Sequence, residues 1–279
     1  MERNQKRFSI FIKTIMYLFS LISFAFLIGI VGYIVVRGVT NIKPELFELK
    51  YTAKNQSMIP SIFNTLLMIL MVLIISLPIG IFSAIYMVEY AKAGNRFVKV
   101  VRLATETLQG IPSIIFGLFG YLFFNSSLGG LGLGYSIISG ALTLSIMVLP
   151  LIIRSTEEAL ISIDNSLREA SYGLGAKKLR TVFNVVLPPA MNGILSGVIL
   201  AIGRIFGETA ALLYTSGIIG RFASPKKSGS TLAVHMYKLS SEGRFFEEAF
   251  VVAFVLLVFV IIINTLSTYI GQRLGGKNI

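Results

Sequence analysis

Six blocks of apolar residues dominate the chain, and each is long enough to cross a bilayer core as a helix, which takes roughly 17 to 25 residues. The blocks lie near residues 14–36, 62–88, 104–124, 135–153, 185–214 and 249–272. Their charged residues are Glu106, Arg204 and Glu208. We therefore predict an all-α, polytopic membrane protein, with a cytoplasmic N-terminus over residues 1–13 and a single transmembrane domain over residues 14–279.

The first block and the boundary between the third and fourth blocks each have two possible interpretations. The first block follows four basic residues, as the apolar part of a signal peptide does, but its uncharged run from Thr14 to Val36 exceeds a cleavable segment. We expect it to remain as an anchor. The third and fourth blocks belong to one uncharged stretch between Glu106 and Arg154, which Gly and Ser residues interrupt over residues 125–134. A tight hairpin is therefore predicted there.

The basic residues orient these six helices, because Lys and Arg are retained on the cytoplasmic side. With the N-terminus inside, the inner segments carry 15 basic residues and the outer loops carry 9, while Arg204 lies within a span. The predicted location is therefore the cell membrane, as a multi-pass protein with both termini in the cytoplasm. Contact with lipid headgroups and contact with an anionic molecule both remain open for the nine outer charges.

Composition supports a membrane protein and excludes several chemistries. Hydrophobic residues make up 54% of the chain and charged residues 14%, against about 25% charged residues in soluble domains. The net charge of +12 favours anionic lipid or an anionic substrate over nucleic acid. The sequence has no cysteine, and His235, its one histidine, is expected to be structural. We expect no cofactor, no metal site and no catalytic residue.

The inner loop over residues 154–184 contains a second kind of helix signal. Ser166 and Glu169 are spaced as a capping box, in which each side chain satisfies a backbone donor of the other residue. This pattern predicts that an amphipathic helix begins at Ser166 and that Gly175 ends it in a left-handed conformation. From the spacing alone, a simple connector and a docking helix are equally good interpretations.

The same loop resembles the EAA loop of type I ABC importer permeases, written EAA-x₃-G-x₉-I-x-L-P. The matching segments are Glu169-Ala-Ser-Tyr-Gly-Leu-Gly175 and Val185-Val-Leu187-Pro188, with Ser171 and Val185 as departures. In that family the short helix docks on a separate ATPase subunit. The resemblance therefore implies that ATP hydrolysis occurs on another chain and that a set of residues here couples to it: Ser166, Glu169, Ala170, Gly175, Leu187 and Pro188.

Three further segments resemble the PstA-type phosphate branch of that family: residues 77–90, 106–113 and 203–210. This resemblance implies a homologous PstC-like permease, ATP-binding ATPase subunits and an extracytoplasmic phosphate-binding protein as partners. A permease for molybdate, sulfate or a phosphonate is an alternative. A secondary transporter or channel that works without ATP is another, and inverted repeats and broken helices would be expected for it.

Charged residues inside spans suggest where an anion crosses, since they are costly in lipid and usually face an interior. On a continuous helix, Arg204 and Glu208 would share one face with glycines, and the planar fork of Arg suits an oxyanion such as phosphate. The alternative is an i, i+4 pair that neutralises itself. In the third block, Glu106 and Ser113 would lie on a second small and polar stripe, for which helix packing is the alternative.

Overall fold

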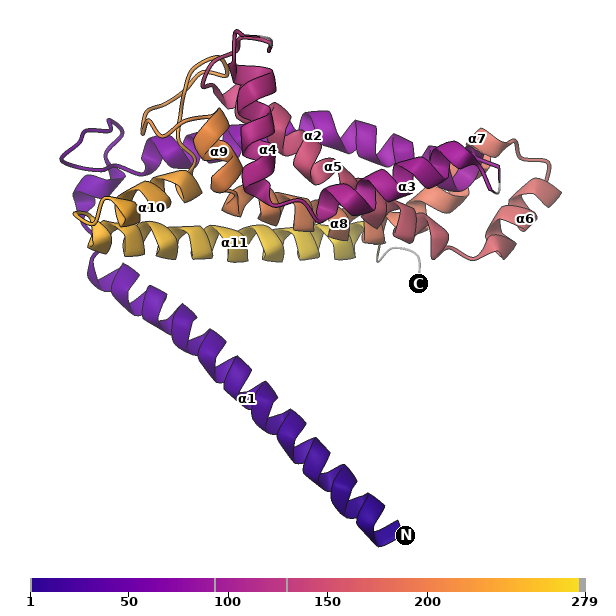
Figure 1. Cartoon of the computed structure of the whole chain (residues 1–279). Helices are drawn as coiled ribbons and strands as arrows, with labels where there is room; N and C mark the ends of the chain where they lie inside the picture. The colour runs from indigo at the N-terminus through magenta and orange to yellow at the C-terminus, as the bar shows by residue number, and fades with distance from the viewer. Residues whose placement is uncertain (1, 93, 129, 276–279) are drawn as a thin grey trace.

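The computed structural model of the chain describes residues 2–92, 94–128 and 130–275, and every regular element in these ranges is helical (Figure 1). The prediction of an all-α protein is confirmed. The α-helices are α1 (Glu2–Thr40), α2 (Ile59–Ile85), α3 (Arg96–Gln109), α4 (Ser113–Gly120), α5 (Ile137–Ile161), α6 (Asn165–Gly173), α7 (Lys178–Thr181), α8 (Leu187–Gly207), α9 (Ala210–Thr215), α10 (Leu232–Ser241) and α11 (Phe246–Gly275). A 3-10 turn, η1 (Pro44–Phe47), and three π-helical turns, η2 (Tyr86–Tyr90), η3 (Tyr121–Asn125) and η4 (Val182–Val186), complete the set.

Four long helices, α2, α5, α8 and α11, form the bundle and run along one common axis (Figure 1). They bury a continuous apolar core that includes Val72, Leu144 and Val252. The closest approaches need glycine, because a Cβ on Gly80 of α2 would lie 2.6 Å from a side-chain carbon of Ile152 in α5. In a bilayer, where lipid is as apolar as the core, such close packing is what favours association of helices.

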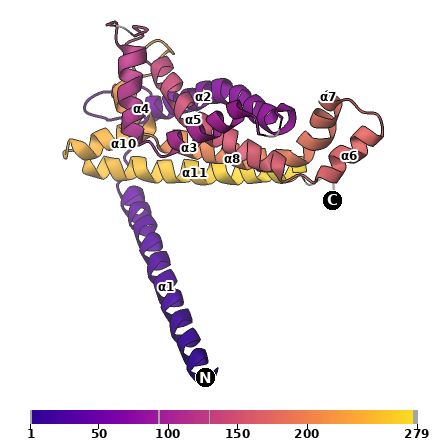
Figure 2. The same ribbon diagram turned by 45° about the vertical axis from the view of Figure 1, so that its right-hand side comes forward.

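Helix α1 leaves this bundle and projects away from it in both views (Figures 1 and 2). It is joined to α11 by its last turns, where Tyr33 packs edge-on against Phe250 at 5.5 Å and Gly38 lies against Phe254. The most apolar window of α1 is entirely unburied within this chain. Such a surface is stable when lipid or another membrane subunit covers it.

Two of the expected spans are broken, which corrects the sequence analysis. Five helices are long and apolar enough to cross a membrane, and α3 with the following segment Ser113–Asn125 makes a sixth if a 104° bend is allowed within one span. Pro112 adopts an extended conformation at the bend and cannot continue the ladder of α3. The expected helix over 185–214 also ends early, since α8 stops at Gly207 and α9 begins at Ala210.

The end of the bundle opposite α6 is closed by packed loops and α10. The side chain of Asn64 in α2 donates to the carbonyl of Arg221 at 2.8 Å and accepts from the backbone of Ala223 at 3.0 Å. His235 is fully buried, with its Nε2 3.1 Å from the carbonyl oxygen of Gln56. Burial lowers the pKa of His235 to about 4. This geometry fits the structural role that we expected for His235.

Candidate functional site

The short helices that follow the two helix breaks, α4 and α9, pack against each other. A Cβ on Gly117 of α4 would lie 2.8 Å from the Cα of Ala211, and one on Gly120 would lie 2.7 Å from the Cγ2 of Thr215. In Figure 1, α4 and α9 stand across the long axis of the bundle. Broken helices expose backbone groups at membrane depth, which is tolerated where they line a cavity or lie within protein.

Arg204 lies in the last turn of α8, next to one of these breaks. Its side chain is half-buried, and in the described part of the chain no hydrogen bond, ion pair or ring contact involves it. The flanking glycines on the same side, Gly203 and Gly207, have open space where a Cβ would be, with no other atom within 4 Å. This side of α8 therefore presents an unpartnered guanidinium beside an open surface.

Glu208 does not pair with Arg204, which corrects the expected i, i+4 arrangement. The helix ends at Gly207, and Glu208 itself is extended, with ψ of 125°. Its Oε1 accepts a hydrogen bond from the backbone N–H of Ala211 at 3.0 Å, in the first turn of α9. A carboxylate at a helix N-terminus satisfies a free donor and interacts favourably with the dipole. The self-neutralising pair is thus absent, and Glu208 stabilises the break instead.

Glu106 and Ser113 do not share a stripe either, because the bend at Pro112 separates them. Ser113 is the first residue of α4 and is half-buried, whereas Glu106 is exposed near the end of α3. Glu106 accepts a hydrogen bond from Nη1 of Arg154 at 3.1 Å, and Arg154 also pairs with Glu158 at 2.8 Å. Sequence reasoning missed Arg154 as a partner of Glu106. The two residues flank the uncharged stretch that was predicted to form a hairpin, and a hairpin brings its two ends together.

The loop over residues 154–184 forms a short helix, α6, that begins differently from the prediction. Asp164, not Ser166, is the N-cap, and its Oδ1 accepts from the backbone N–H of Ser166 at 2.8 Å. This hydrogen bond lowers the pKa of Asp164 below its usual value. Ser166 is the second residue of the helix, so the proposed capping box with Glu169 is wrong. An ionised carboxylate interacts with the helix dipole more favourably than a neutral hydroxyl does.

The end of α6 follows the prediction. Gly175 has φ of +81°, and the paired bonds of a Schellman cap are present, from Gly175 N to Tyr172 O at 2.9 Å and from Ala176 N to Ser171 O at 3.1 Å. A Cβ would meet no atom at Gly175, so the left-handed backbone is what requires glycine there.

Exposed apolar residues at α6 and its C-terminal cap border a groove of about 510 Å³. Leu174, at the tip, is 90% exposed and Leu167 is 44% exposed. The groove runs from these residues to Arg180 and Asn184. Leu187 and Pro188 lie outside it, as the first two residues of α8. Figures 1 and 2 show α6 beyond the end of the bundle, where another protein can reach it.

Comparison with known families decides what kind of protein carries these features. The family described as "Binding-protein-dependent transport system inner membrane component" matches residues 76–276, which include both helix breaks and α6. The chain belongs to this family. It is a multi-pass membrane transport component of an ABC importer and not an enzyme, because the ATPase of these systems is a separate subunit.

Individual relatives agree with the family. The chain is 32% identical to "Probable ABC transporter permease protein YqgI" of Bacillus subtilis, over 91% of each chain. It is 31% identical to "Phosphate transport system permease protein PstA" of Pasteurella multocida, over 83% of this chain and 82% of that protein. Some relatives are longer, and the chain spans 40% of the PstA homolog of Mycoplasma pneumoniae. A crystal structure of a bacterial alginate ABC transporter matches the whole chain and 98% of its counterpart, with TM-score 0.69 and 16% identity, which shows the same fold.

The family assignment changes the meaning of the broken helices. They were expected for a transporter that works without ATP, yet they occur here in an ABC importer permease. Breaks at membrane depth therefore do not separate the two classes. Among the residues that the structure describes, no group of three or more His, Cys, Asp or Glu could hold a metal ion.

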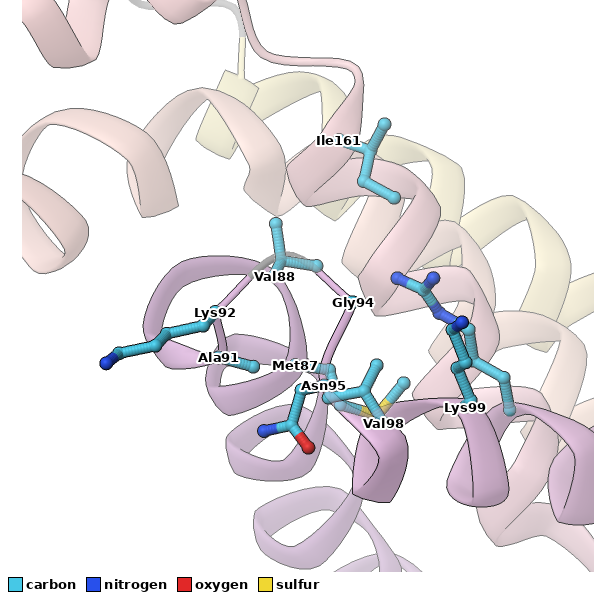
Figure 3. A pocket seen from close by; sticks show the side chains of 10 residues that line it. Met87, Val88, Ala91, Lys92, Gly94, Asn95, Val98, Lys99 and Ile161 are labelled. Atoms are coloured by element: carbon cyan, nitrogen blue, oxygen red, sulfur yellow. The ribbon is translucent and has the colours of Figure 1, made fainter.

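A basic cavity of about 320 Å³ lies between η2, the start of α3 and the end of α5 (Figure 3). Lys92, Lys99 and Arg102 line it. Lys92 points away from the space in Figure 3, and Arg102 is held by Glu157 at 2.6 Å. We assign no ligand to this cavity, since these two cations are directed elsewhere.

Proposed function

We propose that the chain carries inorganic phosphate into the cytoplasm as a permease subunit of an ATP-driven importer. The observation that carries the proposal is the likeness to the PstA protein of Pasteurella multocida, which extends over most of both chains. The unpartnered Arg204 supports it, because a planar guanidinium offers two parallel, charge-assisted hydrogen bonds to an oxyanion and stays protonated when desolvated.

Arg204 would guide the anion along the open side of α8. A homologous, PstC-like permease would face this side and supply the other half of the path, so that Arg204 is covered by protein and ligand instead of lipid. Ser113 begins α4 at the neighbouring break, and Glu106 contributes to a polar wall through Arg154. Glu208 acts on the path indirectly, by holding the start of α9.

Two protein partners would bind opposite ends of this subunit. The ATPase would dock on α6 and its groove, where Glu169, Ala170 and the left-handed Gly175 shape the surface. Ser166, Leu187 and Pro188 support the same region at the starts of α6 and α8. The extracytoplasmic phosphate-binding protein would bind the opposite end, near α10, where five outer basic residues follow α9.

The proposed location is the cytoplasmic membrane, with both termini inside the cell. Counting the bent pair as one span gives six crossings, which place both ends on one side, and the basic residues favour the cytoplasmic side. A reporter fused after Ile279 should be cytoplasmic, and one inserted between residues 125 and 134 should be external. The opposite pattern would contradict the orientation.

The substrate is tested by transport in proteoliposomes that contain the purified complex of permease, ATPase and binding protein. Uptake of radiolabelled phosphate should require ATP, and it should resist a tenfold excess of molybdate, sulfate or methylphosphonate. If one of these competitors were taken up faster than phosphate, that competitor and not phosphate would be identified as the substrate. Phosphate uptake at the full rate without ATP would instead support a secondary transporter or channel.

A further inference from the structure

The guanidinium of Arg168 bonds α6 to the ends of two other helices. Arg168 of α6 donates to Oε1 of Glu89 from Nη2 at 2.7 Å and from Nε at 3.1 Å. It also donates to the carbonyls of Leu160 at 2.9 Å and Ile163 at 2.7 Å, at the end of α5. One side chain of α6 is therefore bonded to the ends of two long helices, although Arg168 and Glu89 are 79 positions apart in the sequence.

This ion pair differs from the others in its burial. The side chains of Arg168 and Glu89 are 13% and 5% exposed. In every other ion pair among the described residues, at least one side chain is 44% exposed or more. Exposed pairs contribute little, because water screens them, whereas removing one partner of a buried pair leaves an uncompensated charge. The contact between α6 and η2 is thus stiff by comparison.

Glu89 lies at the end of a membrane-spanning helix, so a displacement of Glu89 can move the whole helix. It lies in η2, the wide π-helical turn that continues α2 without interruption from Ile59 to Tyr90. Helix α2 in turn packs tightly on α5 through Gly80 and Ile152. A displacement of Glu89 therefore acts on a helix that crosses the bundle and not on a loose connector.

We infer that Arg168 and Glu89 are positioning residues that make α6 and the inner end of α2 move as one unit, so that α2 follows when the ATPase displaces α6. The inference rests on the proposed docking of the ATPase at α6. Without the pair, the short turn between α5 and α6 would absorb the displacement. No contact of either residue with substrate is implied.

A label experiment tests this inference without requiring a substrate. This chain has no cysteine, so spin labels at Lys92→Cys, just after η2, and at the exposed Tyr172→Cys in α6 are unique within it. Partner subunits in which any cysteine is replaced by serine complete the transporter. In the complete transporter we expect one narrow distance that stays the same with and without ATP. In the Glu89→Gln variant we expect this distance to broaden or to change when ATP is added.

Transport supplies the second measurement. For Glu89→Gln and for Arg168→Gln, we expect the ATPase to co-purify normally while the phosphate taken up per ATP hydrolysed falls at least fivefold. The double variant should be no worse than the single ones, because both act through the same contact. Glu89→Asp, which keeps the charge, should recover part of the ratio. Glu247→Gln removes an exposed carboxylate, 63% exposed beside Lys43, and should change neither measurement.

The inference would be overturned if Glu89→Gln kept both the parental transport ratio and the single narrow distance. It would also be overturned if the two Gln substitutions acted additively. Should Glu89→Gln fail to assemble, the same two measurements on Arg168→Gln, which breaks the same contact from the other side, decide between these results. A parent complex that takes up no phosphate would refute the proposed substrate, while the label distances would still test the contact.

Discussion

Two arginines of this chain have opposite surroundings: Arg168 in α6, beyond one end of the bundle, and Arg204 beside the break that ends α8. Arg168 is largely buried, and acceptors of its own chain hold it on several sides: Glu89 and two backbone carbonyls. Arg204 is half-buried at the end of α8 and has no such acceptor in the described part of the chain. A guanidinium has five hydrogen-bond donors. Where acceptors of the same chain satisfy them, the arginine links two parts of the protein. Where they do not, the donors are available to another molecule.

The cost of each arrangement supports this distinction. Desolvating an unpaired charge is expensive, and in a bilayer a cation within a span usually faces protein or a water-filled path. The open space beside Gly203 and Gly207 is where such a path can lie. Arg168 has no comparable freedom, because its donors are already used.

The largest effect is expected when Arg204 loses its charge. Arg204→Gln removes two charge-assisted hydrogen bonds to phosphate, and uptake should fall by roughly 100-fold or more, since each such bond contributes about 1.5–3 kcal/mol. Arg204→Lys keeps a point charge without the fork and should fall by roughly tenfold. Uptake of radiolabelled phosphate at matched membrane abundance measures both.

The double variant Arg204→Gln with Glu208→Gln separates a phosphate guide from a neutralising pair. If the two charges merely balanced each other, removing both would restore transport. Because Glu208 bonds to the backbone of Ala211 and not to Arg204, we expect the double variant to stay inactive. Recovery close to the parental rate would contradict the role of Arg204.

The sequence predicted the helical frame, because long apolar blocks are visible in it. It also predicted that Gly175 ends α6, because a glycine directly after a helical pattern is typical of a left-handed cap. It did not predict that α8 ends at Gly207, since the residues that follow continue a helical pattern. The break is marked instead by a hydrogen bond from the backbone N–H of Ala211 to the side chain of Glu208. The start of α6 was misplaced because Asp164 and Ser166 are both good caps two residues apart. The contact between Glu89 and Arg168 joins segments too distant in sequence for any periodicity to reveal.

The second prediction weakens the coupling end and leaves the path intact. Gly175→Val forces a β-branched residue into a left-handed conformation, at a cost of about 1–2 kcal/mol. The cap of α6 should distort, and the amount of ATPase that co-purifies should fall several-fold. Gly175→Asn is the matched control, because asparagine tolerates this conformation, and it should bind nearly as well as the parent. Equal ATPase recovery in the two variants would show that the cap does not shape the docking surface.

The third prediction concerns the end of the bundle opposite α6 and tests how stability depends on pH. Burial holds the pKa of His235 near 4, below its unfolded value of 6.5, so the unfolded state binds more protons between these values. Stability that is fully present above pH 6.5 is therefore lost as the pH falls, by about 1 kcal/mol between pH 7 and pH 5.5. Thermal unfolding in detergent should show this loss in the parent. His235→Gln can still donate to Gln56 but does not titrate, so its midpoint should change less over the same range. An unchanged pH dependence in this variant would assign the loss to other groups.

The smallest effect is expected at Ser171, where the chain departs from the EAA pattern. Its hydroxyl is buried and lies 2.8 Å from the hydroxyl of Thr181 in α7, so the departure adds a hydrogen bond between α6 and the start of the next span. Ser171→Ala returns the usual residue of the pattern and removes that bond, which is worth about 0.5–1.5 kcal/mol. Thr181 keeps a long bond to the carbonyl of Lys177 at 3.4 Å, so it is not left without an acceptor. We therefore expect a small fall in the thermal midpoint and less than a twofold change in phosphate taken up per ATP, against the fivefold change for Glu89→Gln. If phosphate taken up per ATP fell as much in Ser171→Ala as in Glu89→Gln, the contact of α6 with α7 would be as important as its contact with η2. The buried ion pair would then not be what makes the contact with η2 stiff.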